Sequence, residues 1–155
     1  MKCRVCRGPA VIDVRRHNAN FCEEHFLRLC RDQVERAIKQ HQMLSAGDRI
    51  LVAVSGGKDS LAVWDILLEL GYQVDGLYLG LGIDGYSGQS EAYARAFAKD
   101  RDLSLEVVDL PADYGYDIPN GARAARRVPC SACGLSKRHL FDEAARRGNY
   151  DALVT

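Results

Sequence analysis

A glycine-rich hexapeptide, "SGGKDS", occupies residues 55–60 between two apolar segments. Its two glycines would let the backbone approach a ligand closely with the amide groups exposed, and its lysine adds a full positive charge. Ser55 and Ser60 supply hydroxyl donors, and Ser60 could also cap a helix. Asp59 could orient the lysine or hold Mg²⁺ on a bound phosphate. The hexapeptide therefore predicts a phosphate-binding loop.

Two common phosphate-binding motifs do not fit this loop. A Walker A motif requires glycine five residues before the Gly57-Lys58 pair, and Val52 stands at that position. The dinucleotide pattern G-x-G-x-x-G is also absent from this turn. The sequence thus excludes the usual anchors of P-loop nucleotide hydrolases and of pyridine-nucleotide enzymes.

Four residues near the N-terminus have the spacing of a zinc site. Cys3-x-x-Cys6 is followed after fifteen residues by Cys22-x-x-His25. Four such ligands complete a tetrahedron with no open position, which is typical of structural zinc. We expect Cys22 and His25 to share one face at the start of a helix.

Two neighbouring residues are weaker candidates for that zinc site. His17 lacks the pairing with Cys22, and Cys30 is better explained as a small core residue on the apolar side of the following helix.

A second cysteine pair lies in "RRVPCSACGLSKRH", which we place just before a helix. Cys130 and Cys133 are surrounded there by basic residues, which favours metal binding or sulfur chemistry. The alternative is half of another zinc site or a buried pair. Since only Cys30 is left unassigned, the chain alone does not supply four cysteines for an iron–sulfur cluster, and we expect a third ligand beyond residue 155.

Hydrophobic patterning predicts alternating strands and helices after the cysteine-rich start, which itself looks irregular. A helix of about 20 residues should end near Gly47, and strands follow at 49–54, 72–81, 103–110 and from 150. Helices are expected at 60–70, 90–101 and 134–147, with a long loop over 111–129. This order predicts an α/β fold with a mostly parallel, Rossmann-like sheet that binds ligands at the carboxyl ends of its strands.

Length and composition favour one principal domain with a small appendage. The chain has 155 residues, 47% of them hydrophobic, and equal numbers of basic and acidic residues, 21 each. We assign residues 1–46 to a zinc knuckle and helix and 47–155 to the sheet domain, which we expect to be truncated at its C-terminal end. No signal-peptide pattern or membrane-length apolar run is visible, so we expect a cytoplasmic protein with no membrane association and with reduced cysteines.

The balanced total charge conceals a basic segment at residues 115–147. Seven basic residues outnumber three acids there, a surplus of about four charges. The basic residues are Arg123, Arg126, Arg127, Lys137, Arg138, Arg146 and Arg147. This segment could face phosphates, or it could be a solvated helix face.

With its strand-to-helix context, the hexapeptide resembles the PP-loop of the ATP pyrophosphatase superfamily, whose adenine nucleotide alpha hydrolase-like domains bind ATP and split it between the α and β phosphates. Together with the zinc-type knuckle and "PCSACGLSKR", it resembles the tRNA 2-thiouridine synthetases, which act on T-loop or wobble uridines. The resemblance runs from Cys3 to the last residue.

This resemblance implies a set of site residues and cofactors. ATP and Mg²⁺ would bind at the loop, adenine would lie near Tyr78 and Leu79, and Zn²⁺ would fill the knuckle. Cys130 and Cys133 would hold a [4Fe-4S] cluster that carries sulfur, and Lys137 would lie near the ATP phosphates. The residues expected to bind nucleotide are Ala53, Val54, Ser55, Gly56, Gly57, Lys58, Asp59, Ser60, Leu79 and Lys137, and those expected in catalysis are Cys130, Cys133, Lys137 and Asp59.

The resemblance also implies tRNA as substrate, a ubiquitin-like sulfur-carrier protein as donor and a homodimer. Four tyrosines, Tyr78, Tyr86, Tyr93 and Tyr114, could stack on bases, although tyrosines at such positions are more often core or rim residues. Two alternatives stay open. A tRNA cytidine 2-thiolase shares the loop and the cysteine pair but is not expected to have the zinc knuckle, and a non-catalytic zinc-dependent binding module could retain the loop.

Overall fold

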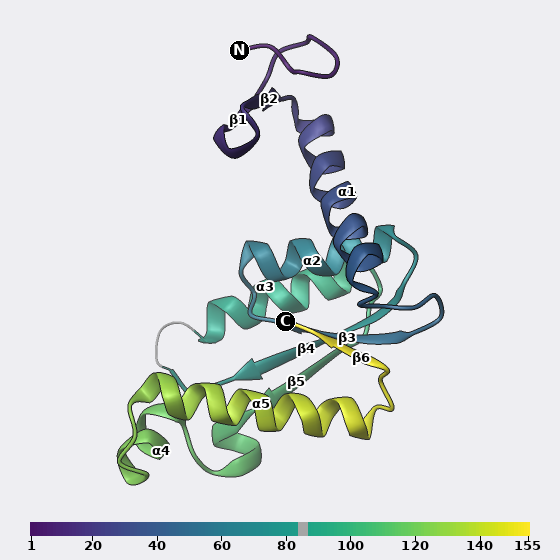
Figure 1. The fold of residues 1–155 in the computed structure, drawn as a ribbon. Coiled ribbons are helices and arrows are strands. Elements are labelled where there is room, and N and C mark those ends of the chain that lie inside the picture. The colour runs from purple at the N-terminus through teal and green to yellow at the C-terminus, as the bar shows by residue number, and fades with distance from the viewer. Residues whose placement is uncertain (84–86) are drawn as a thin grey trace. The chain divides into compact units, whose positions relative to one another are not determined.

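The computed structural model describes residues 1–83 and 87–155. The chain divides into two compact units, Met1–Ser45 and Ala46–Thr155 (Figure 1). Tyr86, one of the tyrosines considered for base stacking, lies outside the described residues.

The N-terminal unit is a short hairpin followed by a long helix. Strands β1 (Ile12–Val14) and β2 (Ala19–Phe21) pair in antiparallel register, with Ile12 opposite Phe21. A small core forms around Cys3, Ala19 and Phe21, all of them buried. Helix α1 (Glu23–His41) follows. The prediction of an irregular start was therefore wrong, and α1 ends before Gly47, with Gln42 as its left-handed C-cap.

The larger unit contains a four-stranded parallel sheet in the order β5-β4-β3-β6. Its elements in chain order are β3 (Arg49–Val54), α2 (Lys58–Glu69), β4 (Gln73–Gly80), α3 (Ser87–Asp100), β5 (Leu105–Asp109), a π-helical turn (Leu110–Tyr114), α4 (Ile118–Ala124), α5 (Pro129–Arg147) and β6 (Ala152–Val154). The predicted α/β fold with a parallel sheet is confirmed.

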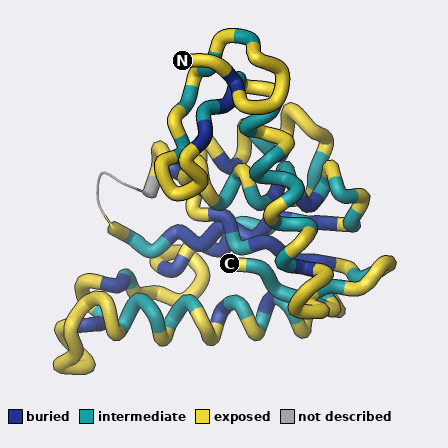
Figure 2. The backbone as a smooth tube through the Cα atoms, turned by 45° about the horizontal axis from the view of Figure 1, so that its top comes forward, coloured by how far each residue is buried: buried dark blue, intermediate teal, exposed yellow. Residues whose placement is uncertain are grey.

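Helices cover both faces of this sheet, with α2 and α3 on one face and α5 on the other (Figure 1). The two central strands, β3 and β4, are mostly buried (Figure 2). Successive residues of β4 point to opposite faces of the sheet, as strand geometry requires. Leu77 packs with Leu140 of α5 in one cluster, whereas a Cβ on Gly76 would lie 2.3 Å from the ring of Trp64 in α2. Gly76 therefore lets α2 pack closely on the sheet.

The prediction of a long loop over residues 111–129 was wrong. Asp109 and Asp117 each cap a helical turn, accepting hydrogen bonds from the amides of Ala112 and Asn120. Prolines stand in the first turns of these elements and of α5, where their missing amide costs nothing. They mark helix starts here, and α5 consequently begins at Pro129 rather than near residue 134.

Within the part of the chain that the structure describes, no helix has the length and apolar character needed to cross a membrane.

Candidate functional site

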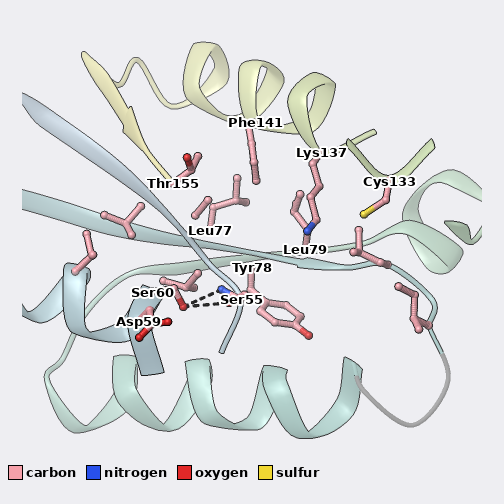
Figure 3. A pocket seen from close by; sticks show the side chains of 16 residues that line it. Ser55, Asp59, Ser60, Leu77, Tyr78, Leu79, Cys133, Lys137, Phe141 and Thr155 are labelled. Atoms are coloured by element: carbon pink, nitrogen blue, oxygen red, sulfur yellow. Dashed lines mark hydrogen bonds between the residues drawn. The ribbon is translucent and has the colours of Figure 1, made fainter. Parts of the chain in front are cut away.

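A cavity of about 620 Å³ opens at the carboxyl ends of β3 and β4, in the larger unit (Figure 3). Its lining comes from the ends of these strands, the first turns of α2, one side of α5 and the last residue of the chain. The lining residues are Val52, Ala53, Val54, Ser55, Asp59, Ser60, Val63, Leu77, Tyr78, Leu79, Leu81, Ile83, Cys133, Lys137, Phe141 and Thr155. The structure thus places Ser55, Asp59 and Ser60 of the hexapeptide, the end of β4 and one side of α5 around one space, at the edge that the parallel topology predicts.

Ser60 folds the glycine-rich loop from within. Its Oγ accepts a hydrogen bond from the Ser55 amide at 3.1 Å and donates one to the Gly57 carbonyl oxygen at 2.9 Å. The Oγ atoms of Ser55 and Ser60 lie 3.2 Å apart. Ser60 is not the helix cap that we predicted, because Gly57 occupies the N-cap and α2 begins at Lys58.

Gly56 is required by its surroundings. Its φ is +74°, and a Cβ there would lie 2.0 Å from the carbonyl oxygen of Ser90 in α3. A side chain would both strain this left-handed backbone and collide with the α3 backbone. The loop therefore rests directly against α3, which fixes its path above the sheet.

Lys58 and Asp59 form an exposed ion pair. The Lys58 Nζ donates to Asp59 Oδ1 at 2.7 Å, and the two side chains are 88% and 90% exposed. Asp59 lines the cavity, but Gly56, Gly57 and Lys58 are not among its lining residues. Of the residues expected to bind nucleotide, these three are not brought into the cavity, and Lys58 would have to leave Asp59 to reach an anion there.

Helix α5 turns one side toward the cavity. Cys133 and Lys137, four residues apart, both line it, and so does Phe141 one turn further on. Cys130 lies in the first turn of α5 and is exposed, outside the lining. Both cysteines belong to the helix itself, so the prediction that they precede it was wrong.

The wall of the cavity is largely apolar. Tyr78 and Leu79, which we expected near adenine, are 3% and 8% exposed and line it at the end of β4. Sequence reasoning missed Leu77 and Phe141. Leu77 could have been found by the two-residue period of a strand from Leu79, and Phe141 by the four-residue helical spacing from Lys137. Such a wall suits a flat base.

The four residues with zinc spacing meet in the N-terminal unit. The ligand atoms of Cys3, Cys6, Cys22 and His25 all lie within 4.8 Å of one another. The Cys6 and Cys22 Sγ atoms are 3.8 Å apart, and Cys3 Sγ is 3.7 Å from His25 Nδ1. Zinc–sulfur bonds of about 2.3 Å in a tetrahedron would separate the ligand atoms by about 3.8 Å. The donor set and its spacing therefore fit zinc.

Local structure explains how these ligands converge and how they ionise. Cys22 is the N-cap of α1, which places His25 in its first turn. Burial of the Cys3 thiol opposes ionisation, but hydrogen bonds from the amides of Cys6, Cys22 and Val5 outweigh it and lower its pKa to about 6. At Cys22 a hydrogen bond from the His25 amide lowers the pKa of the thiol. Burial and the neighbouring thiols outweigh it, so that the pKa is raised overall. Binding of a metal ion would therefore displace a proton from Cys22.

His17 and Cys30 are not part of this group of ligands. Among the described residues, no second group of three or more His, Cys, Asp or Glu side chains is arranged to hold a metal ion. Cys130 and Cys133 alone do not form such a group.

Comparisons with known proteins agree with this arrangement. Residues 2–27 match the N-terminal LIM domain of the 2-thiouridine synthetase TtuA. The whole chain is 48% identical to a tRNA-5-methyluridine(54) 2-sulfurtransferase of Thermus thermophilus and 41% identical to one of Pyrococcus horikoshii. It covers 48% and 49% of these proteins, so the chain spans about half the length of the curated relatives it matches.

A solved structure shares the fold. The U34-tRNA thiolase NcsA from Methanococcus maripaludis, which was determined with its [4Fe-4S] cluster, superposes with a TM-score of 0.82 at 25% identity. The match covers 99% of this chain and 52% of that one. The resemblance to the tRNA 2-thiouridine synthetases is confirmed over the whole chain.

Replacing Cys22 with serine should abolish tight zinc binding, since three ligands remain and Cys22 also starts the helix that places His25. We expect one zinc per chain in the parent protein and less than about a tenth of that in Cys22→Ser, measured by elemental analysis after dialysis. Cys30→Ser is the matched control and should retain the full zinc content. Equal zinc in both variants would contradict the assignment.

Proposed function

We propose that this chain is the ATP-binding part of an enzyme that converts a tRNA uridine to 2-thiouridine. The observation that carries this proposal is the single cavity lined by the glycine-rich loop, the end of β4 and the Cys133–Lys137 side of α5. ATP would have to activate the C2 position of the uridine, and sulfur would then have to reach the same carbon. This cavity is lined by residues suited to both steps.

The first step would be adenylation of the uridine. The C2 oxygen attacks the α-phosphorus of ATP, and the bond to the β-phosphate oxygen breaks to release pyrophosphate. Exposed loop amides and the start of α2 would stabilise charge on the leaving group, and Asp59 would hold Mg²⁺. Lys58, released from Asp59, and Lys137 would add positive charge, while adenine would rest on the wall at Tyr78 and Leu79.

The second step would replace oxygen by sulfur. A sulfur nucleophile adds to C2, the C2–O bond breaks, and AMP leaves with that oxygen. Cys130 and Cys133, at i and i+3 in α5, would bind two irons of a [4Fe-4S] cluster, which needs a third protein ligand. Such a cluster would supply an open iron that holds the sulfur. Lys137, one turn from Cys133, would stabilise the negative charge that develops on the departing AMP.

The comparisons favour uridine 54 as the target. The relatives named for 5-methyluridine 54 are 48% and 41% identical to this chain, whereas the U34 thiolase is 25% identical. We further propose a cytoplasmic homodimer that receives sulfur from a ubiquitin-like carrier protein, in keeping with the resemblance. The match of residues 2–27 and the converging zinc-type ligands argue against a cytidine 2-thiolase. The intact loop argues against a non-catalytic module.

Removing the Ser60 hydroxyl should weaken ATP binding by up to about thirtyfold, because the hydroxyl makes two hydrogen bonds that fold the loop and each contributes about 1 kcal/mol. Isothermal titration of Mg-ATP into Ser60→Ala measures this. Ser104→Ala removes an exposed hydroxyl outside the cavity and should leave the affinity unchanged. If the parent chain itself binds no ATP, the nucleotide half of the proposal fails.

Anaerobic reconstitution with iron and sulfide tests the sulfur half. In a version extended past residue 155 with a third cysteine, we expect the broad visible absorption of a [4Fe-4S] cluster. The band should disappear in Cys130→Ser, Cys133→Ser and persist in Cys30→Ser, because only the α5 pair faces the proposed cluster. A band that survives the double replacement, or an extended protein that forms no cluster, would rule out this sulfur-transfer scheme.

A further inference from the structure

The arginines of the basic segment noted in the sequence form two groups with different environments. Arg146 and Arg147, at the end of α5, have acidic partners. Arg146 lies 4.0 Å from Asp142, and Arg147 contacts Glu106 and, at 3.6 Å, Glu143. These two arginines are therefore committed to contacts within the fold.

The other four arginines of the segment have no such partners among the described residues. Arg123, Arg126, Arg127 and Arg138, which we name the arginine surface, are exposed. None of them has an acidic partner among the described residues, and only Arg123 makes a side-chain hydrogen bond that we can identify, to Asn120. Four unneutralised guanidinium groups in one region attract an anion with several charges.

The arginine surface lies beside the proposed chemistry. Every residue from 123 to 131 is exposed, a stretch that joins α4 to the first turn of α5 and includes Cys130. Arg138 lies along α5 over Gly134, with its Nη1 3.7 Å from where a Cβ would stand on that glycine. Its neighbour Lys137 lines the cavity. The arginine surface therefore shares helix α5 with two residues that line the cavity, Cys133 and Lys137.

A tyrosine that the sequence did not single out borders the same surface. A Cβ on Gly121 would lie 3.0 Å from the Tyr116 ring, so glycine lets the ring lie close against α4 without being displaced. The Tyr116 hydroxyl donates to Ser136 Oγ at 3.1 Å, and the residue is 38% exposed. Tyr116, Arg127 and Leu135 line a groove of about 140 Å³. The ring is thus held in place with part of its surface open.

Three tyrosines that the sequence analysis considered for base stacking lie in environments different from that of Tyr116. Tyr78 is buried at 3% exposure, and the Tyr114 hydroxyl donates to Glu143 on α5. Tyr93 is exposed on α3 and shares a hydrogen bond with Gln89.

We propose that the arginine surface and Tyr116 form a binding site for single-stranded RNA, with phosphates on the arginines and one unpaired base on the tyrosine ring. Sites for single strands combine a basic track with aromatic platforms in this way. All four positions are arginine, whose planar guanidinium binds phosphate through two parallel hydrogen bonds. The proposal rests on the proposed function for its biological substrate, a tRNA segment with the target uridine turned out.

The test compares two charge-matched double variants of the chain by fluorescence anisotropy, using a labelled RNA hairpin with a seven-nucleotide loop at several salt concentrations. Arg126→Gln, Arg127→Gln should weaken binding about tenfold or more and reduce the salt slope by about 1.4, as expected for two lost phosphate contacts on a single strand. Arg146→Gln, Arg147→Gln removes the same charge and should change binding less than twofold. Equal effects of the two variants would overturn the proposal.

Variants of Tyr116 test the contact with a base without changing the charge of the surface. Tyr116→Ala should weaken binding of the loop RNA roughly tenfold, whereas Tyr116→Phe retains the ring and most of the affinity. A fully paired duplex of equal length should bind more weakly and show no effect of Tyr116→Ala. An acidic polypeptide that displaces the RNA with higher affinity would assign the surface to a protein partner instead. The assay needs neither ATP nor a cluster, so its result is independent of the catalytic proposal.

Discussion

The apolar contact between α5 and the sheet is the constraint on which the site depends. Leu140 and Ala144 pack in one buried cluster with Leu77 of β4. The same helix turns Cys133 and Lys137 toward the cavity (Figure 3). A helix is a rigid rod over this length, so burying its C-terminal half sets where its N-terminal half projects. Non-directional hydrophobic packing thus decides the position of the Cys133 thiol, which lines the cavity.

A group of polar contacts at the amino ends of β3 and β4 supports this packing. The Tyr150 hydroxyl donates to Asp75 Oδ2 at 2.7 Å, and the Arg49 guanidinium lies 4.8 Å from the centre of the Tyr150 ring. Asp151 accepts a hydrogen bond from the Arg49 amide at 2.8 Å. Burial and the adjacent Asp75 raise the pKa of Tyr150 to about 12, so the phenol stays a donor. These contacts fix the chain between α5 and β6 against the starts of β3 and β4.

The parts of the fold that depend on local pattern could be predicted from the sequence, and those that depend on distant contacts could not. Continuous apolar runs indicated the buried strands, and the glycine-rich loop indicated the site at their ends. The helical turns after β5 were not predicted because they depend on the side chains of Asp109 and Asp117, which cap them. Tyr116 was missed because its position depends on a close approach to α4 that no local pattern records.

The proposed chemistry requires that nucleotide and thiol share one cavity. The most direct measurement is the rate at which Cys133 of the cluster-free chain is alkylated by iodoacetamide, with and without Mg-ATP, read for each cysteine by peptide mass spectrometry. A shared cavity predicts that ATP slows alkylation of Cys133, which lines it, by several-fold and leaves the exposed Cys130 much less protected. Unchanged alkylation of Cys133 at a nucleotide concentration shown to saturate the chain would contradict it.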